Sequence, residues 1–218
     1  LAGAARKACI RKYWAAPLKN GFMHETGIRI LIRFVQLTAT KHEKAMAPIL
    51  SYSREHYARA FFKCRTGAKQ VDKLLRKHKV LLYCDKCCYR EYLEKTTAAT
   101  NCHNCKNEKV KIAGPLWAGR LSDYKLLKKM AAITAEDKAK EYLAVAAAEN
   151  KKEFLPFYSI PDLCSTYKVQ QPKTTAIIHE LRKTGKEAEA TIFSTTGFRT
   201  TATIRQIVKD IVKNLRKY

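Results

Sequence analysis

The chain has 218 residues, of which 46% are hydrophobic, and it carries 43 lysine and arginine residues against 19 aspartate and glutamate residues. A chain of this length can bury a core without covalent staples, which argues against a small disulfide scaffold. Its formal net charge of +24 concentrates polyanions around it, so the expected partner is RNA or DNA. The alternative is a thermophilic protein whose surface is covered with ion pairs. Such a protein would contain more similar numbers of basic and acidic residues.

Nothing in the sequence points to a membrane or to export. No stretch approaches the roughly 20 apolar residues of a bilayer span, and the first residues lack the apolar core of a signal peptide. These features predict a cytoplasmic protein without a membrane partner. The chain begins with Leu1 rather than methionine, which we interpret as the start of a fragment of a longer protein.

The first third predicts one helix and two strands. Apolar residues recur on a broad face over 22–44, which predicts a long helix packed against a sheet. Residues 47–52 predict a short buried strand opened by Pro48, and 57–64 alternate as a second strand. This order of one helix followed by two strands is typical of the back half of an α/β domain. The predicted apolar face of the helix comprises Ile28, Leu31, Ile32, Val35 and Leu37.

Two Cys-x-x-Cys pairs, separated by fourteen residues, are the most informative motif. They consist of Cys84 with Cys87 and of Cys102 with Cys105. Each short loop can turn both sulfurs toward one ion, so the four thiolates predict a tetrahedral zinc site. Four protein ligands leave no position for water or substrate, which favours a structural role over a catalytic one.

Two neighbouring residues leave alternatives open for this ligand set. Cys88 directly follows the first pair, and His103 lies inside the second pair, so either could replace one of the four sulfurs. The cysteines outside the pairs are scattered, as is typical of a reducing cytosol in which disulfides are rare. An all-sulfur site is favoured over a mixed one.

The residues around the pairs predict a zinc-ribbon-like element at 80–113. Strands at 80–83 and 110–112 lead into the first pair and out of the second. Gly114 and Pro115 are predicted to turn the chain out of the element.

Residues 121–152 predict a helical connector. Ser122 is predicted to cap its first helix, and Thr134 with Asp137 resembles a capping box for the second, alanine-rich helix.

Residues 156–218 resemble a winged-helix module, a type that often binds nucleic acid and in other cases only contacts protein. Helices are predicted at 160–167 and 174–184, followed by a strand at 189–194 and a loop around Gly197. An amphipathic helix ends the chain. Its apolar face comprises Ile204, Ile207, Val208, Ile211, Val212 and Leu215.

Two places near the N-terminus are candidate RNA contacts. Cations surround Tyr13 and Trp14, a mixture suited to phosphate contact and base stacking; a solvated helix face with two core aromatics is the alternative. His24 and Glu25 could form an acid–base pair or contact RNA, and a helix-capping role for Glu25 is the alternative. The cations are Arg6, Lys7, Arg11, Lys12 and Lys19.

The segment Gly197-Phe198-Arg199-Thr200 offers flexible backbone, an aromatic ring and a guanidinium, so Arg199 is a candidate phosphate contact. An ordinary β-turn is the alternative. Catalytic signatures are absent from the sequence: it has no glycine-rich phosphate loop, no Gly-x-Ser-x-Gly elbow and no His-Glu-x-x-His pair.

Several segments occur in the order found in one protein family. They are Cys9-Ile-Arg-Lys-Tyr13, Pro17-Leu18, His24-Glu25-Thr-Gly27-Ile-Arg29-Ile-Leu31, Leu50-Ser-Tyr-Ser-x-x-His56-Tyr57, the two cysteine pairs, Gly114-Pro115-Leu116-Trp117 and Gly197-Phe198-Arg199-Thr200. The ordered set, which spans nearly the whole chain, resembles archaeal and eukaryotic tRNA (guanine-26-N2)-dimethyltransferase.

This resemblance implies an enzyme that uses S-adenosyl-L-methionine to methylate the exocyclic N2 of a guanine in tRNA. It implies an α/β fold in which residues 1–66 are the rear of a Rossmann-like class I methyltransferase sheet. Residues 67–218 would be an α+β C-terminal domain with the zinc-ribbon-like and winged-helix-like parts. The catalytic and cofactor-binding residues would lie upstream of residue 1, so the chain alone is expected to bind tRNA without catalysing methyl transfer. A non-catalytic zinc-ribbon and winged-helix RNA-binding protein is the alternative.

Overall fold

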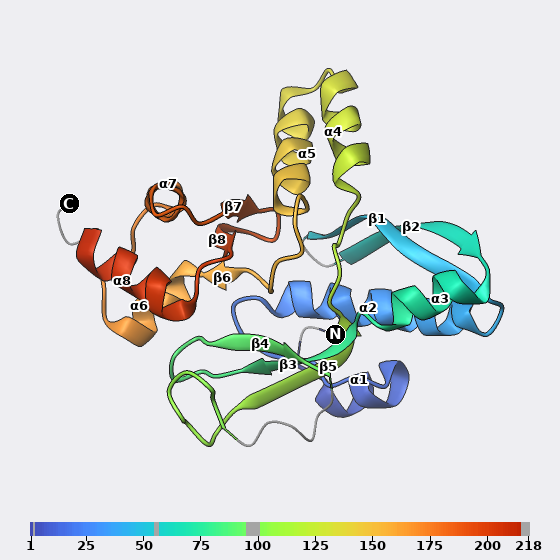
Figure 1. The fold of residues 1–218 in the computed structure, drawn as a ribbon, viewed down its shortest axis with the longest axis horizontal. Helices are drawn as coiled ribbons and strands as arrows, with labels where there is room; N and C mark the ends of the chain where they lie inside the picture. The colour runs from blue at the N-terminus through green and yellow to red at the C-terminus, as the bar shows by residue number, and fades with distance from the viewer. Residues whose placement is uncertain (2, 55–56, 95–100, 215–218) are drawn as a thin grey trace.

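The computed structural model describes residues 1, 3–54, 57–94 and 101–214 (Figure 1). His56 of the quoted motif and Leu215 of the last predicted helix lie outside the described residues. No helix among the described residues is both long and apolar enough to cross a membrane. In chain order the elements are α1 (Arg6–Tyr13), α2 (Met23–Thr40), β1 (Lys44–Arg54), β2 (Tyr57–Thr66), α3 (Ala68–Leu75), β3 (His78–Tyr83), β4 (Arg90–Leu93), β5 (Lys111–Trp117), α4 (Tyr124–Ile133), α5 (Asp137–Glu149), β6 (Tyr158–Ser159), α6 (Ile160–Tyr167), α7 (Thr174–Lys183), β7 (Ala188–Thr191), β8 (Ser194–Thr200) and α8 (Ile204–Asn214).

Helix α2 is central to the first half of the chain because it packs against two sheets. Ile28 and Ile32 meet the β1 and α3 side of the core, whereas Ile30 packs with residues of β3 and β5. The predicted helix is confirmed, but its buried surface differs from the predicted face. Leu31 and Val35 are only half-buried, and Ile30 is fully buried. A helix between two sheets buries a wider arc than a helix on one sheet.

The two sheets beside α2 are antiparallel. Strands β1 and β2 form a hairpin, and β4, β3 and β5 form a sheet in that order. Pro48 lies inside β1 rather than at its start, next to a register shift that accommodates its missing N–H. Gly114 and Pro115 lie inside β5, so the predicted turn is wrong. Gly114 instead exchanges two backbone hydrogen bonds with Ala16, each 2.8 Å long.

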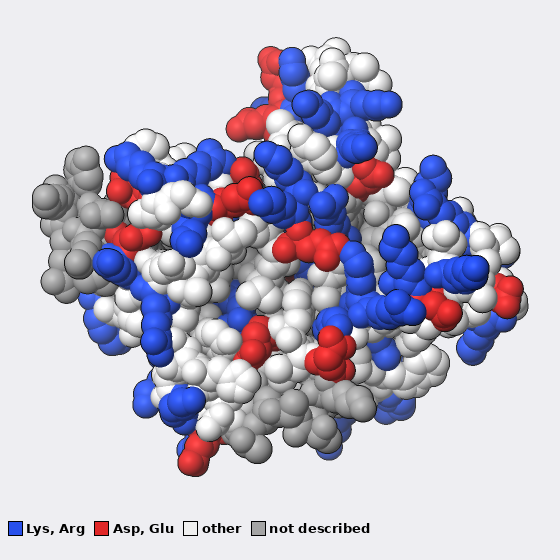
Figure 2. Space-filling model, in the orientation of Figure 1, with Lys and Arg blue, Asp and Glu red and all other residues white. Residues whose placement is uncertain are grey.

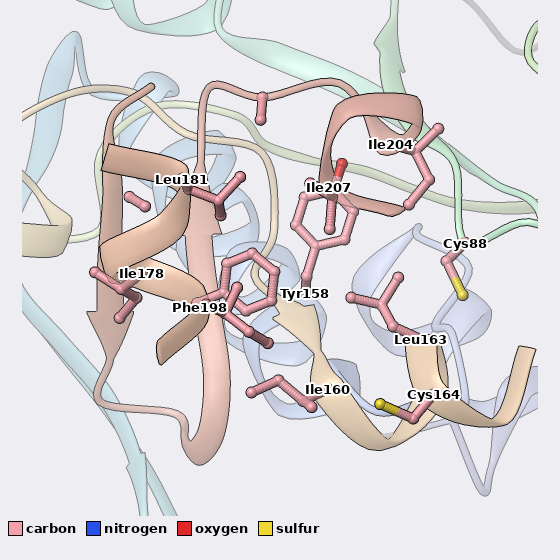
Figure 3. Packing of buried hydrophobic residues seen from close by; sticks show 13 residues of the cluster. Cys88, Tyr158, Ile160, Leu163, Cys164, Ile178, Leu181, Phe198, Ile204 and Ile207 are labelled. Atoms are coloured by element: carbon pink, nitrogen blue, oxygen red, sulfur yellow. The ribbon is translucent and has the colours of Figure 1, made fainter. Parts of the chain in front are cut away.

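The last part of the chain folds around its own apolar cluster (Figure 3). Strands β6, β8 and β7 pair in that order, and the rings of Tyr158 and Phe198 stack with centroids 5.7 Å apart. The predicted helix at 160–167 is confirmed as α6, with Ser159 capping its first turn. The predicted loop around Gly197 is wrong, because this glycine lies in β8. A Cβ there would lie 2.6 Å from Cδ2 of Phe157, so glycine serves close packing.

Helices α4 and α5 form an antiparallel hairpin that stands out from the rest of the molecule (Figure 1). Both predicted caps are wrong. Asp123, not Ser122, caps α4 by accepting hydrogen bonds from two backbone N–H groups, while the Ser122 hydroxyl accepts from the backbone N–H of Ser51. Thr134 donates its hydroxyl hydrogen bond back to Met130 at the end of α4 and does not cap α5.

Two hydrophobic clusters contain residues from both sides of position 66. One cluster joins Ala45 of β1 with Val71 of α3 and Trp117 of β5. A second joins Phe22 with Leu81 of β3 and with Phe157. Residues on both sides of position 66 are therefore packed together.

Candidate metal centre and nucleic-acid surface

The four predicted cysteine ligands converge. Their Sγ atoms all lie within 4.8 Å of one another, with Cys84 3.7 Å from Cys105 and Cys87 3.6 Å from Cys102. A tetrahedral zinc ion with Zn–S bonds of about 2.3 Å separates its sulfurs by about 3.8 Å. The four residues therefore fit zinc in both chemistry and spacing.

The backbone repeats the same turn at both pairs. Each pair is followed by a residue with positive φ, Cys88 at 56° and Lys106 at 59°. Backbone hydrogen bonds close the two turns: the Cys84 N–H donates to the Tyr89 carbonyl, and the Cys102 N–H donates to the Asn107 carbonyl. The Asn107 amide also lies 3.5 Å from the Cys84 sulfur, so it can donate to a thiolate there. These bonds hold the sulfurs toward one point.

Neither alternative ligand joins the four sulfurs. The sulfur of Cys88 points toward the C-terminal cluster (Figure 3), where it lies 3.3 Å from the hydroxyl oxygen of Thr166. His103 is half-exposed, and its Nδ1 lies 2.8 Å from a carboxylate oxygen of Glu91. The geometry therefore favours the all-sulfur set over a mixed one.

Residues of the C-terminal part touch both cysteine turns. The Tyr167 hydroxyl donates to the Cys87 carbonyl at 3.0 Å, and the Arg205 Nε donates to the Asn104 side-chain oxygen at 2.9 Å. Burial raises the pKa of the Cys87 thiol. A metal cation bound to the four sulfurs would therefore be needed to stabilise the thiolate form. The cysteine cluster thus joins the β4-β3-β5 sheet to α6 and α8.

Four of the five candidate RNA contacts are on the surface. Arg11 and Lys12 lie in the last turn of α1, and both are exposed, as are Lys19 and His24. Trp14 follows them with 57% of its surface exposed, while its ring remains 5.9 Å from that of Phe34. The alternative required Trp14 to be a core residue, which it is not. Its ring is open to a partner.

Arg199, the fifth candidate, is not on the surface, and its predicted phosphate contact is wrong. Only 2% of its surface is exposed. Its Nε donates to Glu149 at 2.6 Å and its Nη1 donates to Glu25 at 2.9 Å. The guanidinium therefore neutralises two buried carboxylates from α5 and α2, and it has no room for a phosphate.

Glu25 is the centre of this network and neither caps α2 nor forms an acid–base pair with the exposed His24. It accepts from Arg29 at 2.8 Å and from the backbone N–H of Phe157 at 3.0 Å. Burial would raise the pKa of Glu25, but Arg199 and Arg29 outweigh burial and lower it. Burial does raise the pKa of Glu149, which has one arginine partner.

Sequence reasoning also missed Arg90, a fully buried arginine in β4. Its guanidinium carbon lies 4.3 Å from the ring centroid of Phe22 and 4.1 Å from that of Tyr158. Its Nη1 donates to the Phe157 carbonyl at 2.5 Å. Aromatic faces and carbonyls stabilise this cation, and because these partners are distant in the sequence, no local pattern could indicate them.

The excess of positive charge is visible on the face of the molecule that Figure 2 shows. Figure 2 shows lysine and arginine side chains over much of the visible face, above all around the α4–α5 hairpin and the end that carries β2 and α3, with fewer acidic side chains between them. Such a surface attracts a polyanion along its length.

The described residues contain no Rossmann-type turn between a parallel strand and a helix. Rossmann-like folds hold such cofactors at a glycine-rich turn after a parallel strand. The strand pairs among residues 3–54, 57–94 and 101–214 are all antiparallel. We therefore assign no residue of this chain to that cofactor.

Comparison with known proteins gives consistent matches along the chain. The tRNA (guanine(26)-N(2))-dimethyltransferase of Methanobrevibacter smithii is 36% identical over 224 residues, covering 99% of this chain and 57% of the relative. The tRNA (guanine(26)-N(2)/guanine(27)-N(2))-dimethyltransferase of Aquifex aeolicus is 33% identical, covering 97% and 54%. The chain thus spans a little over half the length of these relatives.

A solved structure and a family model agree with these relatives. The structure of Trm1 from Pyrococcus horikoshii in complex with S-adenosyl-L-methionine superposes with a TM-score of 0.79 at 32% identity, covering 96% of this chain and 55% of that chain. Residues 1–212 match the family model described as N2,N2-dimethylguanosine tRNA methyltransferase. The chain therefore belongs to the N2,N2-dimethylguanosine tRNA methyltransferase family.

Proposed function

We propose that this chain is the tRNA-binding part of an S-adenosyl-L-methionine-dependent tRNA (guanine-26-N2)-dimethyltransferase. Family membership over residues 1–212 carries the proposal. The net charge of +24 supports it, because lysine and arginine side chains that neutralise phosphates release counterions and bind RNA tightly at low salt.

The proposed division of labour follows from the chemistry. The exocyclic amine of guanine is a weak nucleophile, so such an enzyme must hold it in line with the methyl donor and accept a proton from it. A base that is stacked or paired within tRNA must also be exposed first, which requires a firm hold on the rest of the tRNA. The exposed cations of this chain are suited to that hold.

We also propose that residues 1–66 are the rear of the methyltransferase domain and that residues 67–218 are the C-terminal domain. The two cysteine turns on the β4-β3-β5 sheet support a zinc-ribbon-like element at 80–113. The order β6, α6, α7, β7, β8 supports a winged-helix-like module at 156–218. The helical hairpin within 121–152 connects them.

Binding of unmodified tRNA tests this function. We expect the chain to bind a tRNA transcript, and the logarithm of the binding constant to fall linearly with the logarithm of salt concentration between 50 and 200 mM. Replacing Arg11 and Lys12 by alanine should lower the slope by about two, because each phosphate contact contributes about one. Fluorescence anisotropy measures both.

The matched control removes two exposed lysines, Lys128 and Lys129, from α4. An equal decrease of the slope in this variant would show that tRNA is held by the basic surface as a whole rather than chiefly at α1, and no tRNA binding by the unaltered chain would contradict the proposed function. The chain is also incubated with tRNA and S-adenosyl-L-methionine, and N2-methylated guanine is measured by mass spectrometry; no methylation is expected, and methylation would contradict the proposal that the chain supplies only tRNA binding.

For the metal, we propose a structural zinc ion held by Cys84, Cys87, Cys102 and Cys105. The purified chain should contain about one zinc ion, Cys102→Ser should contain far less, and the exposed Cys64→Ser should match the unaltered chain. Elemental analysis by mass spectrometry gives these values. Equal zinc in Cys102→Ser and in the unaltered chain would rule out the four-cysteine site.

A further inference from the structure

A groove with a volume of about 640 Å³ lies between the turn end of the β1–β2 hairpin and helix α5. It is separate from the cysteine cluster and from the exposed cations of α1. Three tyrosines from three different elements contribute to its walls, together with three charged side chains. The lining residues that matter here are Tyr52, Tyr57, Tyr142, Arg54, Lys138 and Glu136.

The three tyrosine rings are arranged so that they do not cover one another. The centroid of Tyr52 lies 6.2 Å from that of Tyr57 at an interplanar angle of 77°, and 6.4 Å from that of Tyr142 at 86°. Rings in this edge-to-face arrangement are not stacked on one another, and the Arg59 guanidinium lies over one face of the Tyr57 ring. Tyr57 is 44% exposed, so its ring is accessible from solvent.

The charges in and beside the groove suit an anion. Arg54 and Lys138 line it, and the guanidinium carbon of Arg59 lies 5.1 Å from the Tyr57 ring centroid. Glu136 is the acidic side chain among the lining residues, and a carboxylate can accept hydrogen bonds from the amino group of a base. Burial, with a smaller contribution from Glu149, raises the pKa of Tyr142 to about 12, so its hydroxyl stays neutral beside a phosphate.

Aromatic faces interleaved with cations are the recurring means by which proteins hold single-stranded nucleic acid. An apolar peptide would match the rings but not the two cations at the rim. A lone phosphate would match the cations but leave the ring faces exposed. An unpaired nucleotide satisfies both.

We propose that the Tyr52–Tyr57–Tyr142 groove binds one unpaired nucleotide of the bound tRNA, with the base stacked on the tyrosines and its flanking phosphates near Arg54 and Lys138. The proposal rests on the proposed function, since it requires that the chain binds tRNA. It adds a second contact region, which has no lining residue in common with the groove that Phe61 and Phe62 line with α2.

The test compares Tyr57→Ala and Tyr142→Ala with the control Phe61→Ala. Phe61 is 47% exposed and lies on the same strand as Tyr57, so it matches Tyr57 in size, exposure and element. Binding is measured with the whole 218-residue chain, using a tRNA transcript and a single-stranded RNA octamer that contains 2-aminopurine. Stacking on an aromatic side chain quenches the fluorescence of this base.

We expect Tyr57→Ala and Tyr142→Ala to weaken octamer binding by roughly 5- to 150-fold, the range for losing one stacked base, and to reduce the quenching. Phe61→Ala and the ring-preserving Tyr142→Phe should behave like the unaltered chain. Because Tyr57 is on the surface, its variant tests the groove even if Tyr142→Ala does not fold.

Unchanged octamer binding and quenching in Tyr57→Ala would overturn the groove proposal, while tRNA binding by the same variant would leave the proposed function standing. Loss of binding in Phe61→Ala equal to that in Tyr57→Ala would also overturn it. Binding of an apolar peptide, but of no RNA, to the unaltered chain would overturn both proposals.

Discussion

His78, half-buried at the start of β3, connects this strand to α2. Its Nε2 lies 2.8 Å from the side-chain oxygen of Gln36, whose amide in turn donates to the Met46 carbonyl of β1. Burial, with a smaller contribution from Arg33, lowers the pKa of His78 from 6.5 to about 4. The imidazole donates from Nε2 to Gln36 and, through that side chain, links β3, α2 and β1, while burial favours its neutral form.

At this residue scale we expect the protein to lose stability as the pH falls from about 6.5 to about 4. In that window the unfolded chain binds the His78 proton and the folded chain does not, so the free energy of unfolding decreases on acidification. The pKa shift sets an upper bound of about 3 kcal/mol, and partial exposure reduces it. Urea unfolding at several pH values measures the slope.

The comparison variant is His78→Gln, which cannot titrate, and the control is His179→Gln at an exposed position. The free energy of unfolding of His78→Gln should change less with pH than that of the unaltered chain. The free energy of unfolding of His179→Gln should change with pH as that of the unaltered chain does. If the curves of the unaltered chain and His78→Gln run parallel, the histidine does not contribute this pH dependence.

At the scale of elements, the Arg199 side chain on β8 joins α2 and α5. Arg199→Met leaves the carboxylates of Glu25 and Glu149 buried with one cation fewer, so we expect a loss of about 3–5 kcal/mol in the free energy of unfolding. The control Arg182→Met breaks the exposed pair with Glu189 and should cost less than about 1 kcal/mol. Urea unfolding measures both free energies. Equal losses in Arg199→Met and Arg182→Met would show that the buried contacts of Arg199 stabilise the protein no more than an exposed ion pair does.

At the scale of the whole molecule, the charge of +24 opposes the compact state. Raising sodium chloride from 0.1 to 1 M shortens the screening length from about 10 to about 3 Å, so we expect the melting temperature to rise. A gain of 1 kcal/mol corresponds to about 2–4 °C for a chain of this size. A fall would mean that surface ion pairs such as Lys111–Asp85 outweigh the repulsion. Differential scanning calorimetry distinguishes the two outcomes.

Local sequence patterns correctly predicted the features that are determined by residues close together in the chain. Spacing alone identified the four cysteines that converge, and the helix predicted at 160–167 is α6 with its observed bounds. Features that depend on distant residues were missed. Gly197 looked like a turn because the ring of Phe157 that excludes a Cβ lies forty positions away. Arg199 looked like a surface cation because its partner Glu25 is 174 positions away.

That separation has a consequence for the order in which the molecule is made. A ribosome adds about 5–20 residues per second, so roughly 9–35 seconds pass between the synthesis of Glu25 and the arrival of Arg199. The backbone N–H of Phe157, which also satisfies this carboxylate, comes 132 residues after it. During that interval only Arg29 can pair with Glu25. The complete set of partners of Glu25 therefore cannot form until β8 has been made.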